Sequence, residues 1–343
     1  MKIGVVGAGA IGCWVGGRLA SAKADVLFVG RDRTKRDLEA NGLSAIDSAG
    51  GLRAVKLEPK DVRVTVDSNE LADRDVVLVC VKSAQTEEVA KDLARVLGDR
   101  KVLVASMQNG VRNADTLREH LGKHVVLGGI VEFNVVAKDG GDYRRTTTGA
   151  LVFEATDDPR LAELTSALGD AGIKHVVAKD IRAIQWSKLM MNVNNAVGAL
   201  TDVPTQRLIF EEPYRRIVRA LIEESLRVLD QAEIRPARLG PLPPHVFPYL
   251  LRLPSAILKV VSRVQVSIDP EARSSMWDDL TRGRLTEVDF LNGEIVRLAG
   301  SCGTEAPLNA QIVRLVHKAE RDKGGSPKLS ARELWDALNE KES

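Results

Sequence analysis

The sequence predicts an α/β domain followed by an all-helical domain, and two observations predict this order. Short apolar runs alternate with helical segments over residues 1–178, which is the pattern of a parallel sheet with crossover helices. From Ile181 onward nearly every periodic segment has helical spacing, so the strand pattern stops there. We therefore expect one domain over residues 1–179 and a second over residues 180–343.

The first thirty-one residues give the first domain its type. Residues 2–6 form an apolar run, a glycine-rich turn and a helix-forming stretch follow, and residues 24–29 form a second apolar run. In this context a G-x-G-x-x-G match predicts a dinucleotide-binding, Rossmann-type fold, although an ordinary glycine-rich turn is the alternative. Gly7 permits the tight turn, Gly9 lets a pyrophosphate approach the backbone, and Gly12 lets the helix pack closely. Since N–H groups at a helix start also suit phosphates, we expect the cofactor to contact Gly7, Gly9, Ala10, Ile11 and Gly12.

The residue after the second predicted strand distinguishes the two nicotinamide cofactors. NAD enzymes usually place Asp or Glu about 20 residues beyond the motif, where the carboxylate binds the ribose 2′-hydroxyl. Here Gly30 lies near that place and Arg31 follows it. A guanidinium at this edge suits a 2′-phosphate, so we expect NADP(H) with Arg31 on that phosphate. A one-residue shift would instead put Asp32 at the ribose, and a solvated charge cluster is a third interpretation.

Polar residues follow two further predicted strands. Residues 76–81 form a continuous apolar run, as expected of a strand buried on both faces, and residues 102–106 form another strand. Functional side chains of open α/β sheets lie just beyond the carboxyl ends of strands. Lys82, Gln85 and Asn109 occupy such places. Each alone is as easily a structural turn residue, but together they favour a site.

Two other strand predictions concern the end of the first domain. Residues 125–131 read as one strand. Residues 143–148 and 150–155 read as a hairpin or sheet edge joined at Gly149. A last strand at residues 174–178 then precedes the domain boundary.

The helical domain opens with a helix that carries polar residues on an apolar background. Lys188 and Asn192 are four residues apart and therefore share a face, and Asn194 and Asn195 follow. Polar groups in apolar surroundings need partners, so this cluster is a candidate site. A lysine that faces solvent is the alternative interpretation of Lys188.

Two capping patterns lie nearer the C-terminus. Thr286 is expected to cap a helix that runs through Leu298, so that Glu287 in its first turn complements the helix dipole. Ser330 and Glu333 have the spacing of a capping box at the start of a last short helix.

Composition argues against several classes of protein. The 49 Lys and Arg residues nearly balance the 47 Asp and Glu residues, and no basic stripe with interleaved aromatics indicates nucleic acid. The N-terminus lacks the separate apolar segment of a signal peptide, and charges and a proline break the longest apolar stretch, residues 249–266. The few scattered cysteines indicate a reducing compartment, and the histidines indicate no metal site. We therefore expect a cytoplasmic protein without membrane or nucleic-acid partners.

Several short motifs occur in one order along the chain. They are the glycine turn with Arg31, Val81-Lys82-x-x-Gln85, Gln108-Asn109-Gly110, Trp186-x-Lys188-Leu189-x-x-Asn192, Ser274-Ser275-Met276-x-x-Asp279 and Arg284-x-Thr286-Glu287-x-Asp289-x-x-Asn292-Gly293. As a set they resemble the ketopantoate reductases (2-dehydropantoate 2-reductases), which make pantoate for pantothenate and coenzyme A. The resemblance runs from Met1 to about His317. It implies a Rossmann domain and an all-helical second domain like that of 6-phosphogluconate dehydrogenase, and it leaves a homodimer open.

The resemblance also implies a reaction and a role for each matching residue. The expected reaction is the NADPH-dependent reduction of 2-dehydropantoate, a small 2-oxo acid, to pantoate. Lys188 would donate the proton to the ketone, and Glu287 would contact the cofactor, the substrate or Lys188. The other implied roles are cofactor binding by Lys82, Gln85 and Asn109 and substrate binding by Asn192, Asn195 and Ser275.

Two departures from the family pattern keep alternatives open. The family usually has a second asparagine two turns after the lysine, but Ala196 stands at that spacing here. Asn195 or Asn194 must therefore take the role of that second asparagine. Arg235–Pro270 looks longer than in the compact members and could change the substrate. The alternatives are an NADPH-dependent reductase of another 2-oxo or β-keto acid and a non-catalytic NADPH-binding sensor that acts through a tail containing Trp335.

Overall fold

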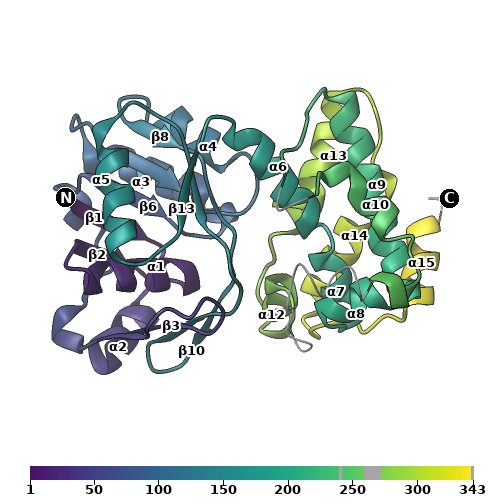
Figure 1. The fold of residues 1–343 in the computed structure, drawn as a ribbon, viewed down its shortest axis with the longest axis horizontal. Helices are drawn as coiled ribbons and strands as arrows, with labels where there is room; N and C mark the ends of the chain where they lie inside the picture. The colour runs from purple at the N-terminus through teal and green to yellow at the C-terminus, as the bar shows by residue number, and fades with distance from the viewer. Residues whose placement is uncertain (239–241, 259–271, 341–343) are drawn as a thin grey trace. The chain divides into compact units, whose positions relative to one another are not determined.

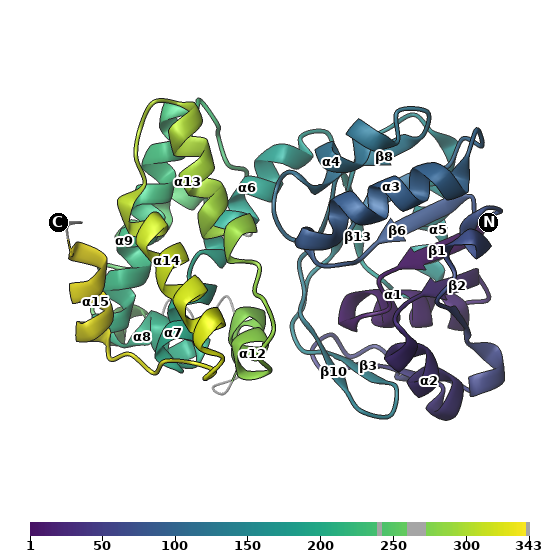
Figure 2. The ribbon, with the colours of Figure 1, turned by 180° about the vertical axis from the view of Figure 1, so that it is seen from behind.

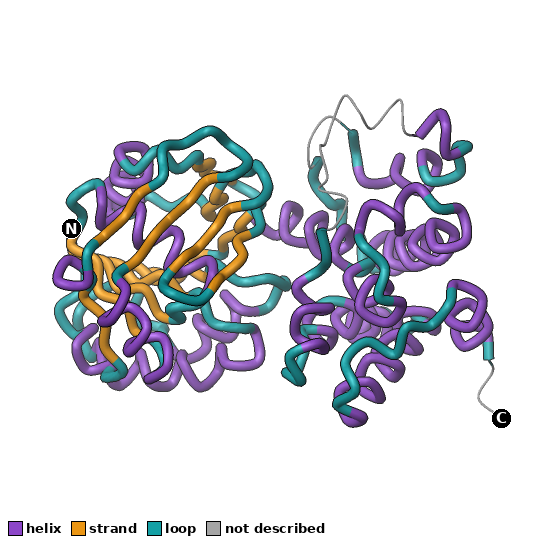
Figure 3. The backbone as a smooth tube through the Cα atoms, turned by 90° about the horizontal axis from the view of Figure 1, so that it is seen from below, coloured by secondary structure: helices purple, strands orange, loops and turns teal. Residues whose placement is uncertain are grey.

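The computed structural model describes residues 1–238, 242–258 and 272–340. The chain forms two compact units, Met1–Ile181 and Arg182–Ser343. All described strands lie in the first unit, whereas the described elements of the second unit are helical (Figures 1 and 3). The predicted fold class, a Rossmann-type α/β part followed by an all-α part, is therefore confirmed.

A six-stranded parallel sheet forms the centre of the first unit. Its strands are β1 (Lys2–Val6), β2 (Asp25–Val29), β5 (Arg63–Thr65), β6 (Val76–Val79), β7 (Leu103–Ser106) and β8 (Val125–Leu127). Their order is β5-β2-β1-β6-β7-β8, and every neighbouring pair is parallel. This is the order of a doubly wound dinucleotide-binding sheet, in which the switch point lies between the first and fourth strands in sequence order, here β1 and β6.

Helices cover both faces of this sheet. They are α1 (Ala10–Ser21) and α5 (Pro159–Asp170) on one face and α3 (Thr86–Leu97) and α4 (Asn113–His120) on the other (Figure 2). Because successive strand residues point to opposite faces, Val76 and Leu78 pack in the core with α1 and α5. Val77 and Val79 pack in the core with α3 and α4. Burial of β6 on both faces explains its unbroken apolar run.

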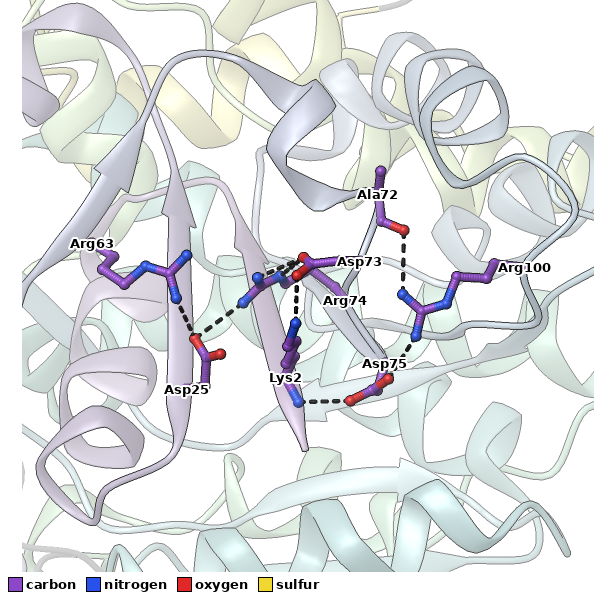
Figure 4. Close-up of polar contacts among 8 residues, drawn as sticks. All are labelled: Lys2, Asp25, Arg63, Ala72, Asp73, Arg74, Asp75 and Arg100. Atoms are coloured by element: carbon purple, nitrogen blue, oxygen red, sulfur yellow. Dashed lines mark hydrogen bonds and ion pairs between the residues drawn. The ribbon is translucent and has the colours of Figure 1, made fainter.

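Ion pairs connect the amino-terminal ends of neighbouring strands of the sheet (Figure 4). Arg74 is buried, and its guanidinium donates to Asp73 at 2.7 Å and to Asp25, at the start of β2, at 3.1 Å. The Lys2 ammonium donates to Asp73 at 2.6 Å, and the Lys2 backbone N–H donates to Asp75 at 2.8 Å. These contacts tie β1 and β2 to the turn that precedes β6, at the edge opposite to the glycine turn.

Two smaller sheets complete the first unit. One has the order β10-β11-β3-β4, and the other has the order β13-β12-β9. Their bounds are β3 (Leu43–Asp47), β4 (Val55–Leu57), β9 (Gly129–Val131), β10 (Val135–Lys138), β11 (Asp142–Arg145), β12 (Leu151–Glu154) and β13 (His175–Ala178). No helix or strand was predicted over residues 32–61, which contain α2 (Asp32–Asn41), β3 and β4.

Two strand predictions are wrong. Residues 125–131 form two strands in two sheets, because the chain leaves the large sheet at Gly128 and β9 then pairs antiparallel with β12. Residues 143–148 and 150–155 form no hairpin, because β11 pairs with β3 and β10 whereas β12 pairs with β13 and β9. The hairpin in this region is instead formed by β10 and β11, whose ladder closes at Lys138 and Asp142. The pairings of β11 with β3 and of β9 with β12 join strands that are farther apart in the sequence.

The second unit consists of helices joined by turns. Their bounds are α6 (Ile181–Asn192), α7 (Asn195–Thr201), α8 (Thr205–Phe210), α9 (Glu212–Gln231), α10 (Phe247–Leu250), α12 (Ser275–Thr281), α13 (Asn292–Ser301), α14 (Pro307–Asp322) and α15 (Ala331–Asn339). The predicted capping box is confirmed, because Ser330 accepts the N–H of Glu333 and Glu333 accepts the N–H of Ser330. Residues 239–241 and 259–270 of the predicted insertion lie outside the described residues. None of the described helices is long and apolar enough to cross a membrane.

The ion pairs of Figure 4 predict a pH-dependent stability. The Lys2 hydrogen bond, and after it the Arg74 guanidinium, lower the pKa of Asp73 to about 2 against the opposing effect of burial. Because this value lies below the unfolded value of about 3.9, the stabilisation is present above pH ~4 and is lost as pH falls toward 2. We expect Asp73→Asn to lower the thermal midpoint at pH 7, and the difference from wild type to shrink steadily between about pH 4 and pH 2. Equal differences at all pH values, or the same profile for the exposed control Asp139→Asn, would contradict this.

Candidate cofactor and substrate site

The glycine turn joins β1 to α1, and its three glycines are required for different reasons. A β-carbon on Gly7, whose φ is +100°, would meet the backbone of Val81 and Cys80 at 2.6 and 2.7 Å. A β-carbon on Gly12 would meet the carbonyl oxygen of Gly7 at 2.3 Å. A β-carbon on Gly9 would meet nothing within 4 Å, and its φ of −96° suits any residue. The packing of the chain thus requires Gly7 and Gly12 but gives no reason for Gly9.

Gly9 leaves open space at the start of a helix. Gly9 is exposed at the N-cap of α1, which has no side-chain cap and no acidic residue in its first turn. The first N–H groups of a helix lack intrahelical acceptors and carry partial positive charge, so an anion there would be stabilised. Ala10 and Ile11 carry the first of these N–H groups, because α1 begins at Ala10. A side chain at Gly9 would project into the region that such an anion needs.

Arg31 occupies the N-cap of α2 and is exposed. The neighbouring Arg33 pairs with Asp139 at 3.5 Å. Within the described ranges, no acidic side chain lies within ion-pair distance of Arg31. Asp32, the alternative ribose ligand, is the first residue of α2, where a carboxylate complements the helix dipole. The arrangement leaves the Arg31 guanidinium available to an external anion.

A buried hydrogen-bond network joins the turns that follow β6 and β7. Asn113 is its centre, because its Oδ1 accepts from the Thr86 hydroxyl at 2.8 Å and its Nδ2 donates to the Asn109 carbonyl. The same Nδ2 donates to the Ser83 hydroxyl at 3.3 Å, and Gln108 Nε2 donates to the Thr86 hydroxyl at 2.7 Å. Ser83, Thr86, Gln108 and Asn113 are all buried. The network therefore fixes the two turns to each other.

This network brings together the predicted cofactor residues Lys82, Gln85 and Asn109. Lys82 precedes the short 3-10 turn Ser83–Gln85, and the Gln85 N–H donates to the Lys82 carbonyl at 2.8 Å. The Ser83 hydroxyl donates to the Asn109 carbonyl at 3.0 Å, so the two turns are adjacent. Sequence reasoning missed Ser83 and Asn113. Their one available signal was a small or amide side chain just beyond a strand end, which is also typical of ordinary turns.

The second unit brings together the predicted substrate residues. α6 ends at Asn192 and α7 begins at Asn195, so these asparagines flank a two-residue break. Ser274 caps α12, and its hydroxyl donates to the Asn195 carbonyl at 3.0 Å. Ser275 is therefore held beside the break as the first residue of α12, and it is exposed. Asn192 and Asn195 are half-buried, whereas Asn194 is 8% exposed, which favours Asn195 over Asn194 as the substrate residue.

Lys188 lies one turn before Asn192 on α6 and is half-buried. Its neighbours Ser187 and Leu189 are buried, at 0% and 1% exposure. The lysine thus emerges from a packed segment of the helix, on the face that also carries Asn192, as the spacing predicts.

Glu287 does not lie in the first turn of a helix, so that prediction is wrong. The Thr286 hydroxyl accepts the Val288 N–H at 3.2 Å in a short 3-10 turn, and α13 begins only at Asn292. The Thr286 backbone N–H donates to Glu320 of α14 at 2.7 Å. Because α14 holds this segment by a side chain, the segment departs from the helical path that its sequence pattern suggests. The proposed contact of Glu287 with Lys188 stays a prediction.

Comparison with known proteins gives two family-model matches. The model described as "Ketopantoate reductase PanE/ApbA" matches residues 3–158, and the model described as "Ketopantoate reductase PanE/ApbA C terminal" matches residues 180–320. The 2-dehydropantoate 2-reductase of Archaeoglobus fulgidus is 31% identical over 93% of this chain and 98% of its own length. The 2-dehydropantoate 2-reductase of Halobacterium salinarum is 29% identical over 94% of this chain and 100% of its own length.

Solved structures share the fold over nearly the whole chain. The PanE/ApbA family ketopantoate reductase from Ralstonia eutropha JMP134 has a TM-score of 0.78 at 30% identity and covers 94% of this chain and 99% of its own. A D-mandelate dehydrogenase with NADH and anilino(oxo)acetate has a TM-score of 0.76 at 21% identity, with coverage of 94% and 99%. The second similarity concerns the fold alone.

The buried network predicts that Asn113 stabilises the first unit. Asn113→Ala would leave several buried hydroxyl and amide groups unsatisfied, and each such group costs about 1–3 kcal/mol. We expect a loss on the order of 2–4 kcal/mol in the free energy of unfolding, measured by urea denaturation. The control is Asn41→Ala, which removes an exposed asparagine that donates to Asp37 at 2.8 Å. Equal losses for the two variants would contradict the assignment.

Proposed function

This chain belongs to the ketopantoate reductase family, a family of oxidoreductases that act on CH–OH groups, and we propose that it reduces 2-dehydropantoate to pantoate with NADPH. The observation that carries the cofactor assignment is the start of α1, where Gly9 leaves open space and the helix has no side-chain cap. Relatives named 2-dehydropantoate 2-reductase, with identities of 28–31% over more than nine-tenths of the chain, support the substrate. We propose the cytoplasm as its location from composition alone.

Residues of the first unit would hold the cofactor. The N–H groups at the start of α1 would bind the pyrophosphate, and Arg31 would bind the 2′-phosphate with two hydrogen bonds. Lys82 and Asn109 would lie along the nicotinamide half, in turns whose mutual position the Asn113 network fixes. When bound, NADPH supplies the hydride that reduces the ketone carbon.

Residues of the second unit would hold the substrate and move a proton. Asn192, Asn195 and Ser275 offer neutral hydrogen bonds to the carboxylate and hydroxyl groups of a 2-oxo acid. As the hydride reaches the ketone carbon, negative charge builds on the ketone oxygen, and the Lys188 ammonium would stabilise that charge and donate a proton to the oxygen. The products are the 2-hydroxy acid, the oxidised cofactor and a neutral lysine that regains its proton from solvent. Glu287 would favour the charged form of the lysine if it lies beside it.

The alternative within the family is a reductase of another 2-oxo or β-keto acid. The fold permits it, because the D-mandelate dehydrogenase shares that fold. A panel of 2-oxo acids tested for NADPH oxidation distinguishes the substrates by kcat/KM. The non-catalytic sensor is less well supported, because the α15 tail is engaged within its own unit: Leu334 and Leu338 are buried, and Arg216 lies 4.1 Å from the Trp335 ring centre.

We predict a preference for NADPH that depends on Arg31. Loss of a charged hydrogen bond costs about 1.5–3 kcal/mol, so Arg31→Ala should raise the KM for NADPH roughly ten- to a hundredfold. The KM for NADH should stay nearly unchanged, which makes NADH the control within the same variant. A wild-type chain that uses NADH better than NADPH would contradict the assignment.

We predict that Lys188 is the general acid. Lys188→Ala should lower kcat by about 10²–10⁴, the usual contribution of a positioned acid, and should keep the affinity for NADPH. Equal losses in kcat and kcat/KM would indicate an interaction made only in the transition state. The control is Lys318→Ala, which removes an exposed lysine of α14. If Lys188→Ala turns over within a fewfold of wild type, Lys188 only extends its ammonium to solvent and the mechanism fails.

A further inference from the structure

We propose that Asn292 and Ser274 are positioning residues that hold the break between α6 and α7, and thereby set the geometry with which Asn192 and Asn195 bind the 2-oxo acid. The inference rests on the proposed function, because it concerns how the substrate residues are held. Neither Asn292 nor Ser274 has an assigned role in that function.

The break creates a need for hydrogen-bond donors. The last carbonyls of a helix have no intrahelical donor and must be satisfied from elsewhere. Here one side chain from a distant part of the chain supplies a donor after the end of α6, and a second donates to the carbonyl of the first residue of α7. Asn292 Nδ2 donates to the carbonyl of Val193, inside the break, at 3.2 Å, and the Ser274 hydroxyl donates to the carbonyl of Asn195 at 3.0 Å.

A chain of buried polar groups fixes the orientation of Asn292. The Glu224 carboxylate accepts from Asn309 Nδ2 at 2.9 Å and from the Asn309 backbone N–H at 2.8 Å. Asn309 must therefore turn its Oδ1 away from Glu224, and this Oδ1 accepts from Asn292 Nδ2 at 3.0 Å. Asn292 and Asn309 are 0% exposed and Glu224 is 7% exposed. Because a carboxylate only accepts, it determines which end of each amide faces the next, and the Asn292 donor faces the break.

Ser274 connects the break to the third substrate residue. Its hydroxyl donates to the Asn195 carbonyl and at the same time accepts the Trp277 N–H at 3.2 Å, which caps α12. Ser275 is the next residue and the first of α12. One hydroxyl thus sets the distance between the start of α7 and the start of α12.

Both contacts engage the backbone of the break. They hold the carbonyls of Val193 and Asn195 and do not use the side-chain amides of Asn192 and Asn195. The amides of these half-buried asparagines can therefore bind a substrate while the backbone beneath them stays fixed. A merely structural role would affect the stability of the unit without a selective effect on the 2-oxo acid.

The test compares Asn292→Asp with wild type in the full chain. The substitution keeps the size of the side chain, removes the amide donors and places a carboxyl group at a site with 0% exposure. We expect the KM for the 2-oxo acid to rise about tenfold, as for the loss of a buried hydrogen bond. The KM for NADPH should stay within twofold, and hydrogen exchange of the backbone amides of residues 193–198 should become faster. The matched control is Asn339→Asp, which makes the same change where Asn339 Nδ2 donates to the Trp335 carbonyl at 2.6 Å on α15.

Two variants of Ser274 provide a second test of the inference, which can be made even if Asn292→Asp does not fold. Ser274→Ala should raise the KM for the 2-oxo acid in the same way, and Ser274→Thr, which keeps the hydroxyl, should restore it. Variants that lower the thermal midpoint but keep both KM values and the exchange rates at the break would overturn the inference alone. A wild-type chain that oxidises NADPH with no 2-oxo acid would instead overturn the proposed function, and the role in substrate binding with it.

Discussion

Backbone groups left without a partner at helix ends are the constraint on which both units depend. Such groups must find a hydrogen bond, from the chain, from water or from a ligand. At the start of α1 the chain supplies no side-chain cap and no acidic residue, so the N–H groups remain available to an anion. At the break after α6 the chain supplies Asn292, whose amide donates to the Val193 carbonyl, so this carbonyl is held internally. We interpret the first helix end as a binding surface and the second as a scaffold for side chains that bind.

The glycine turn shows how one motif combines folding and binding. Gly7 and Gly12 are needed by the fold, since a β-carbon on either would overlap backbone atoms of the chain itself. Substitutions there are expected to damage the packing of α1 on β1 before they affect any ligand. Gly9 is different because its surroundings would accept a side chain. The same three-glycine pattern therefore contains two glycines that the packing requires and one, Gly9, that the packing does not require.

The sequence predicted those features that depend on residues close to one another along the chain. The glycine turn and the capping box at Ser330 both depend on neighbours a few residues away, and both appear in the structure. The pairing of β11 with β3 joins residues about a hundred apart, so the sequence around Tyr143 suggested a hairpin instead. The hydrogen bond from Asn292 to Val193 spans 99 residues and has no local signal. The candidate site was predictable as a set of residue types, but the side chains that position it were not.

Charged side chains at the two ends of the strands of the large sheet differ in whether they have partners within the chain. At the amino-terminal edge the buried Arg74 has acidic partners within the chain, Asp73 and Asp25, because a buried guanidinium without a partner would be strongly unfavourable. At the carboxyl ends of the strands the guanidinium of Arg31 is exposed, and none of the described acidic side chains pairs with it, so it is available to an anion. Substitutions that remove a charge at the amino-terminal ends should therefore change the stability of the fold, whereas substitutions at Arg31 should change ligand binding. The charges at the amino-terminal ends of the strands thus pair within the chain, whereas the carboxyl ends, where the switch point lies, stay open to a ligand.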